Sequence, residues 1–116
     1  MSQQRVLAAV DAFLYRGREG EDVVACVLSD FAESSLRLSA CPTGQVMPVL
    51  RQGEKVMVEF CLGDAGFPHR VQGKVMRHDE QTCVIRTEKI FSDGDYRPLR
   101  LMDVVEIKTQ LLNGTG

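Results

Sequence analysis

The polar stretch from Asp30 to Ser35, Asp-Phe-Ala-Glu-Ser-Ser, contains the side chains of this sequence that are best suited to hold a polar ligand. It places two acids and two hydroxyls between two apolar runs, and it contains no glycine. A carboxylate accepts hydrogen bonds and a hydroxyl both donates and accepts them, so the stretch can bind a ligand. Asp and Ser are also common in hairpin turns, where they bind the backbone of the turn itself. The residues alone leave both interpretations open.

The other reactive side chains do not form a metal-binding or catalytic motif. The cysteines lie about 15 to 22 residues apart without a Cys-x-x-Cys pair, which favours neither a zinc site nor a disulfide scaffold. We expect them to be small buried side chains in strands: Cys26, Cys41, Cys61 and Cys83. The run 78–80 (His-Asp-Glu) is expected to be a solvated loop, and the run 93–95 (Asp-Gly-Asp) a turn before a helix. The sequence predicts no metal site and no enzyme.

Length and composition indicate one ordinary globular domain over residues 1–116. Hydrophobic residues make up 44% and charged residues 26% of the chain, which is typical of a folded protein. A net charge of −2 and only seven aromatic residues argue against a nucleic-acid-binding barrel. The apolar runs are too short to span a membrane, and the N-terminal segment lacks the features of a signal peptide. A cytoplasmic protein is expected.

Alternating apolar residues predict strands over most of the chain. Val56, Val58 and Phe60 alternate with other residues as in a half-buried strand, and Gly73 inside another such run predicts a bulge or a bend. The run 22–29 is apolar on both faces and is predicted to be a central strand covered on both sides. A turn at 78–81 joins the last two runs into a hairpin. The expected strands are the second half of 5–15, then 22–29, 35–40, 54–60, 70–77 and 82–90.

The C-terminal segment has helical rather than alternating spacing. A helix is predicted from Leu99 to Leu112, with Pro98 near its start and Asn113-Gly114 past its end. The face expected to cover the strands carries Leu101, Val104, Lys108 and Leu111. The fold class predicted from these elements is mainly β: a small six-stranded antiparallel barrel with a C-terminal α-helix.

The order of these elements, with the polar turn between the second and third strands, resembles the PilZ family of small bacterial barrels over nearly the whole chain. In that family an N-terminal R-x-x-x-R and a [D/N]-x-S-x-x-G turn together bind cyclic di-GMP. The turn motif aligns on Asp30, which matches, on Ala32 in place of the serine, and on Ser35 in place of the glycine. Arg5 lies where the second arginine would fall, and Met1 where the first would fall.

The resemblance implies a signalling module that binds cyclic di-GMP and regulates motility, adhesion or secretion. Loss of one arginine fork removes roughly 1–3 kcal/mol of binding free energy, so micromolar or weaker affinity is expected. Ser34 can replace the missing hydroxyl if the turn shifts by a residue or two. The alternative is a divergent PilZ-like module that binds a protein partner and no nucleotide. The candidate ligand-binding residues are Arg5, Asp30, Ala32, Ser34 and Ser35; no cofactor is expected.

Overall fold

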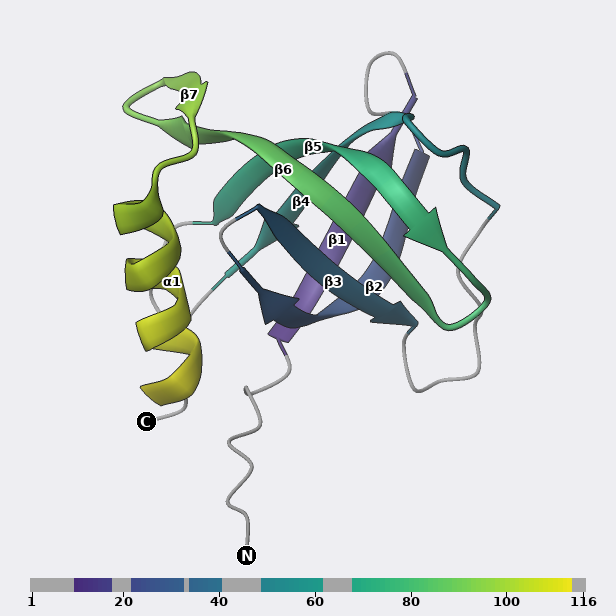
Figure 1. Ribbon diagram of the computed structural model, residues 1–116, viewed down its shortest axis with the longest axis horizontal. Helices are drawn as coiled ribbons and strands as arrows, with labels where there is room; N and C mark the ends of the chain where they lie inside the picture. Colours follow the sequence, from purple (N-terminus) through teal and green to yellow (C-terminus); the bar gives the residue numbers. More distant parts are fainter. Residues whose placement is uncertain (1–9, 18–21, 33, 41–48, 62–67, 114–116) are drawn as a thin grey trace, which may run out of the picture.

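Seven strands and one helix make up the part of the chain that the computed structural model describes, namely residues 10–17, 22–32, 34–40, 49–61 and 68–113. The strands form one antiparallel sheet in the order β3-β2-β1-β4-β5-β6-β7, and pairing of β3 with β6 closes the first six into a barrel (Figure 1). This confirms the predicted six-stranded antiparallel barrel with a C-terminal helix. The elements are β1 (Val10–Arg16), β2 (Asp22–Phe31), β3 (Ser35–Ala40), β4 (Lys55–Phe60), β5 (His69–His78), β6 (Thr82–Ser92), β7 (Asp95–Pro98) and α1 (Leu101–Asn113).

The core lies inside the barrel and is built by the alternation seen in the sequence. Val56, Val58 and Phe60 of β4 point inward and are buried. Burial of each such side chain contributes about 1.5–3 kcal/mol, which makes this alternation the main source of the barrel's stability. The other buried strand residues include Ala12, Leu14, Leu28, Phe31, Leu36, Leu38, Val71, Val75, Ile85 and Ile90.

Gly73 allows β5 and β6 to approach closely. A Cβ at this position would lie 2.2 Å from the Arg86 carbonyl oxygen and 2.8 Å from Cγ2 of Ile85, so no other residue fits without movement of the backbone. The register of β5 and β6 shifts beside it, from the pair Gln72–Lys89 to the pair Gly73–Thr87. The predicted bulge is therefore confirmed. Glycine is needed at this position because there is no room for a side chain.

Helix α1 packs on the barrel through part of the predicted face, because Val104 is buried as expected but Leu101 is not. Val104 and Ile107 are buried, whereas Leu101 is 57% exposed and Lys108 is half-buried. The side chain of Leu111 lies outside the described part. The prediction for Leu101 was wrong because this residue begins the helix, and the buried positions start one turn later at Val104. The helix lies beside the end of β2 (Figure 1).

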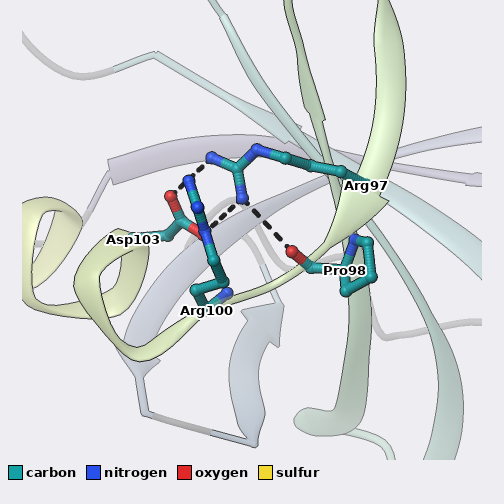
Figure 2. A network of polar contacts seen from close by, with 4 residues as sticks. All are labelled: Arg97, Pro98, Arg100 and Asp103. Carbon is teal, nitrogen blue, oxygen red and sulfur yellow. Dashed lines mark hydrogen bonds and ion pairs between the residues drawn. The ribbon is translucent and has the colours of Figure 1, made fainter.

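A polar network fixes the start of α1 to β7 (Figure 2). The guanidinium of Arg97 donates two hydrogen bonds to the Asp103 carboxylate, of 2.8 and 2.7 Å. The same carboxylate accepts a 2.8 Å hydrogen bond from the backbone N–H of Arg100, the residue before the helix. This is the arrangement of the third helical residue in a capping box, and it satisfies a donor that the helix itself leaves unpaired. These contacts lower the pKa of Asp103 from 3.8 to about 2, with the Arg97 hydrogen bonds as the largest cause.

Two further details of the strands differ from the sequence predictions. Strand β2 is internal to the sheet but is covered on one side only, since Val23 is 51% exposed on the outer face. The turn at 93–95 joins β6 to the additional strand β7 instead of leading directly into the helix. Asp93 and Gly94 both have positive φ, 53° and 85°, as in the tight turns of hairpins. The helix accordingly starts at Leu101, after β7, rather than at Leu99.

The cysteines follow their predicted role in part. Cys26 and Cys83 are buried in strands as expected, and burial raises the pKa of the Cys83 thiol to about 11. Cys61 is exposed just past the end of β4, where the inward alternation has ended, so the prediction was wrong for this residue. Cys41 lies outside the described residues. No helix in the described ranges has the length and apolar character needed to cross a bilayer.

Candidate functional site

The polar turn predicted as the ligand site is the connection between β2 and β3. The backbone N–H of Ala32 donates a 2.7 Å hydrogen bond to the Ser35 carbonyl, which closes the turn. The N–H of Thr87 donates a 3.1 Å hydrogen bond to the Ser34 carbonyl and so ties the turn to β6. Phe31 fills the core directly below and is fully buried. The backbone of the turn is thus held by β2, β3 and β6, which fixes the positions from which its polar side chains extend.

Asp30 faces the outside of the barrel and keeps part of its hydrogen-bonding capacity. A register shift after Leu28 places Asp30 opposite Arg37, and Phe31 opposite Leu36 in the core. The Oδ1 atom of Asp30 accepts a 2.9 Å hydrogen bond from the N–H of Phe31. Within the described part, no other donor contacts this carboxylate. Asp30 therefore stabilises its own turn, as the structural interpretation predicted, and still has an oxygen available for a ligand.

The other predicted residues fall into two groups. Ala32, Ser34 and Ser35 share the turn with Asp30: Ser34 is exposed, and the other two are half-buried. Arg5 lies outside the described residues, so the structure does not bring it to the turn. Ser35 begins β3 and does not have a positive φ, so the backbone here does not require the glycine of the family motif. Serine in place of glycine at position 35 therefore affects only how closely a ligand can approach the backbone.

Two arginines beside the turn were not predicted from the sequence. Arg37 is opposite Asp30 in the β2–β3 pair, and Arg86 is opposite Ser35 in the β3–β6 pair. Both are exposed, and both point outward because their neighbours Leu36, Leu38 and Ile85 point into the core. Directly opposed residues have Cβ atoms about 5 Å apart and diagonal ones about 7–8 Å apart, so these side chains can reach a common ligand. Neither forms an ion pair with a residue in the described ranges.

The alternation Leu36-Arg37-Leu38 shows that Arg37 points outward, but the pairing that brings Arg86 to the turn cannot be recognised from the sequence. Together, the cluster offers two guanidinium forks, one carboxylate and two hydroxyls on one outer surface of the barrel. A guanidinium fork pairs with phosphate oxygens or with O6 and N7 of guanine, and a carboxylate accepts hydrogen bonds from an amine. We call the set Asp30, Ser34, Ser35, Arg37 and Arg86 the turn cluster.

Other chemistry has little support in the described residues. They contain no group of three or more His, Cys, Asp or Glu side chains arranged to hold a metal. The loop at 78–81 is a turn in which the Asp79 carboxylate accepts hydrogen bonds from the N–H groups of Gln81 and Thr82, at 2.8 and 2.9 Å. The Gln81 hydrogen bond is the largest cause of the lowered pKa of Asp79. This carboxylate holds the loop together, as expected for a structural turn.

Comparison with known proteins adds no assignment, because the chain matches no family model, no curated protein and no solved structure.

Proposed function

We propose that this protein is a PilZ-like bacterial signalling module that binds cyclic di-GMP at the turn cluster with low affinity. The observation that carries the proposal is the pair of outward arginines, Arg37 and Arg86, next to Asp30 and Ser35. The closed barrel with its C-terminal helix supports the same assignment, since it has the architecture that the resemblance implies. The biological output would be control of motility, adhesion or secretion.

The ligand's chemistry fits the residues that the cluster offers. Cyclic di-GMP has two phosphates and two guanines, and each is a target for an arginine fork. The free oxygen of Asp30 can accept a hydrogen bond from a guanine amino group, and the Ser34 hydroxyl can bind a phosphate oxygen. Arg37 and Arg86 would supply part of the positive charge that the family draws from its N-terminal motif.

The cluster's departures from the family motif explain why the affinity should be low. Ala32 has no hydroxyl, and Asp30 shares one oxygen with its own backbone. Arg37 and Arg86 are exposed, so each contact to a phosphate is screened by water and salt. A dissociation constant in the micromolar range is therefore expected.

Calorimetric titration of the protein with cyclic di-GMP tests the proposal. Arg37→Ala and Arg86→Ala should each weaken binding about tenfold, because each removes one charge-assisted contact. Arg51→Ala is the matched control: Arg51 is also exposed and without an ion pair in the described part, but it lies in the turn before β4. Cyclic di-AMP, which lacks the guanine O6 atom, should bind more weakly than cyclic di-GMP.

A second set of variants tests whether the turn has lost family chemistry. Ala32→Ser combined with Ser35→Gly, in a chain extended at its N-terminus with an arginine four residues before Arg5, should tighten binding by roughly ten- to a thousandfold. Absence of binding in both the native and the restored protein would contradict the proposal. Nanomolar binding that is unchanged in Arg37→Ala and Arg86→Ala would place the ligand elsewhere.

A protein-binding module without nucleotide is the second candidate, and one observation favours it. Leu101, Met102 and Val105 of α1 are 57%, 77% and 56% exposed, although the opposite face of the same helix is buried. Exposed apolar groups gathered on one helix are typical of protein contact surfaces. This candidate becomes the better one if the titrations show no cyclic di-GMP binding.

A further inference from the structure

A hollow on the outer side of the barrel borders the turn cluster, since Lys74 in its lining is opposite Arg86 in the β5–β6 pair. Its volume is about 460 Å³, within the range of roughly 300–1,000 Å³ that ligand clefts occupy. Residues of β1, β4, β5, β6 and β7 line it, and none of them belongs to the turn cluster. The residues that matter for the argument are Tyr15, Lys55, Gln72, Lys74, Lys89 and Tyr96; we call them the tyrosine–lysine hollow.

The strand pairing explains how these side chains come together. Tyr15 is opposite Met57, which is opposite Gln72, which is opposite Lys89, so one row crosses four strands. Lys55 and Lys74 are opposite each other in the next row. Strand β7 continues the sheet past the barrel and contributes Tyr96 on the side away from Tyr15. The two tyrosines thus stand on opposite sides of a floor made by β4, β5 and β6.

The charge of the hollow is opposite to that of the whole chain. Three lysines line it against one acid, Glu88, while the chain has a net charge of −2. Glu88 is 4.0 Å from Nζ of Lys74, and both side chains are at least 40% exposed, so this ion pair neutralises little. Lys55 and Lys89 form no ion pair with any described residue. The hollow therefore presents ammonium groups that an anion can engage.

The two tyrosines are held in place by contacts behind the hollow. The hydroxyl of Tyr15 donates a 3.0 Å hydrogen bond to Glu59, and Glu59 accepts a 2.9 Å hydrogen bond from Arg70. The Arg70 guanidinium lies 5.6 Å from the centre of the Phe91 ring, which packs edge-on against Tyr96 with the ring centres 5.1 Å apart. One continuous set of contacts therefore connects both tyrosines. Because the tyrosine side chains are already held in place, binding of a ligand costs less of their conformational entropy.

We propose that the tyrosine–lysine hollow binds a small phosphorylated ring compound of the nucleoside monophosphate class. The ring would pack against the face of Tyr96, and the phosphate would be bound by Lys55 and Lys89. The amide of Gln72 lies on the floor between them and can bind polar atoms at the edge of the ring. None of these contacts uses a residue of the turn cluster, although Lys74 of the hollow is opposite Arg86 of the cluster.

Titration of isotope-labelled protein with 5′-AMP, followed by NMR, tests this inference. AMP should shift the resonances of Tyr15, Gln72, Lys74 and Lys89, and the double variant Lys55→Gln and Lys89→Gln should weaken binding at least tenfold. Tyr96→Leu should also weaken it, because the leucine removes the aromatic face. Arg51→Ala should leave the affinity for AMP unchanged. This control shows that the lysine variant acts through the hollow and not through a lower positive charge of the whole protein. Melting temperatures of the lysine and Arg51 variants should equal that of the native protein, since these side chains are exposed, whereas Tyr96→Leu should lower it slightly by removing the ring contact with Phe91.

The experiment also compares AMP with adenosine, with inorganic phosphate and with an oligoadenylate. Adenosine and inorganic phosphate should each bind at least tenfold more weakly than AMP, because each lacks one half of the proposed contacts. The inference is overturned if AMP does not move these resonances, if the lysine variant binds AMP as well as the native protein does, or if phosphate alone binds as tightly as AMP. An oligoadenylate that binds at least tenfold more tightly than AMP would also overturn it, since the hollow would then be part of a nucleic-acid surface.

Discussion

Replacing Asp103 with asparagine should lower the free energy of unfolding by about 1–2 kcal/mol. The carboxylate accepts two hydrogen bonds from Arg97 and one from the Arg100 backbone, and its pKa falls from 3.8 to about 2 (Figure 2). Since one pKa unit corresponds to about 1.4 kcal/mol, the shift corresponds to somewhat over 2 kcal/mol. Water reaches the 31% exposed side chain of Arg97 and screens the pair, so we expect the smaller value.

The same network gives a defined dependence of stability on pH. The pKa of Asp103 is lower in the folded than in the unfolded protein, so the unfolded state takes up the proton first on acidification. The stabilisation is fully present above pH 3.8, and it is lost as the pH falls from there to about 2. The D103N variant should lack this part of the acid sensitivity.

Urea unfolding at pH 7 and at a series of acid pH values measures both effects. Asp11→Asn is the control, because Asp11 is exposed on β1 and forms no hydrogen bond with a described residue. D103N should shift the unfolding midpoint, whereas D11N should leave it within about 0.5 kcal/mol of native. If D103N has native stability at pH 7, the network does not hold the helix to β7 and the reasoning from the pKa is refuted.

Three further predictions concern the barrel and the helix. Gly73→Ala should destabilise by about 3 kcal/mol, measured by thermal unfolding, because its Cβ would overlap the Arg86 carbonyl; native stability would show that β5 and β6 can separate at no cost. Ile107→Asp should cost more than about 3 kcal/mol by burying an unpaired charge, while Val105→Asp on the exposed face should change stability by less than about 0.5 kcal/mol. Equal effects would mean that the helix packs through another face. The pKa of His69, measured by NMR, should lie below 6.5, because burial disfavours its charged form; folding should therefore become less favourable as the pH falls below 6.5. Glu106→Gln should lower this pKa further, because it removes a nearby negative charge. An unchanged pKa would refute the proximity of Glu106 to His69.

The sequence predicted the barrel because most of its strands have one buried face. Val56, Val58 and Phe60 alternate without interruption, and this pattern depends only on neighbouring residues. Strand β7 was missed because a four-residue strand that ends in proline shows no alternation. The helix was recognised and Val104 of its predicted face is buried, but the exposure of Leu101 was not foreseen, because it depends on where the helix first meets the barrel.

The candidate site was predictable only in its local part. The turn from Asp30 to Ser35 lies in one continuous stretch, so its position between two strands could be read directly. Arg86 reaches the same turn through the β3–β6 pairing that closes the barrel, and such a pairing between distant segments leaves no local signal. The tyrosine–lysine hollow was missed for the same reason, because its residues come from five strands.

The bulge beside Gly73 determines which residues of β6 face each of the two proposed sites. Ile85 and Ile90 are both buried, yet they are five positions apart, and a regular strand would place residues at an odd spacing on opposite faces. The extra residue, Glu88, lies between the pairs Gly73–Thr87 and Gln72–Lys89 and restores the inward position of Ile90. Arg86 precedes the bulge and faces outward as part of the turn cluster, whereas Lys89 follows the bulge and lines the hollow. Without the bulge, Lys89 would point toward the core and Ile90 toward solvent, so the bulge is a condition for the hollow as well as for the core.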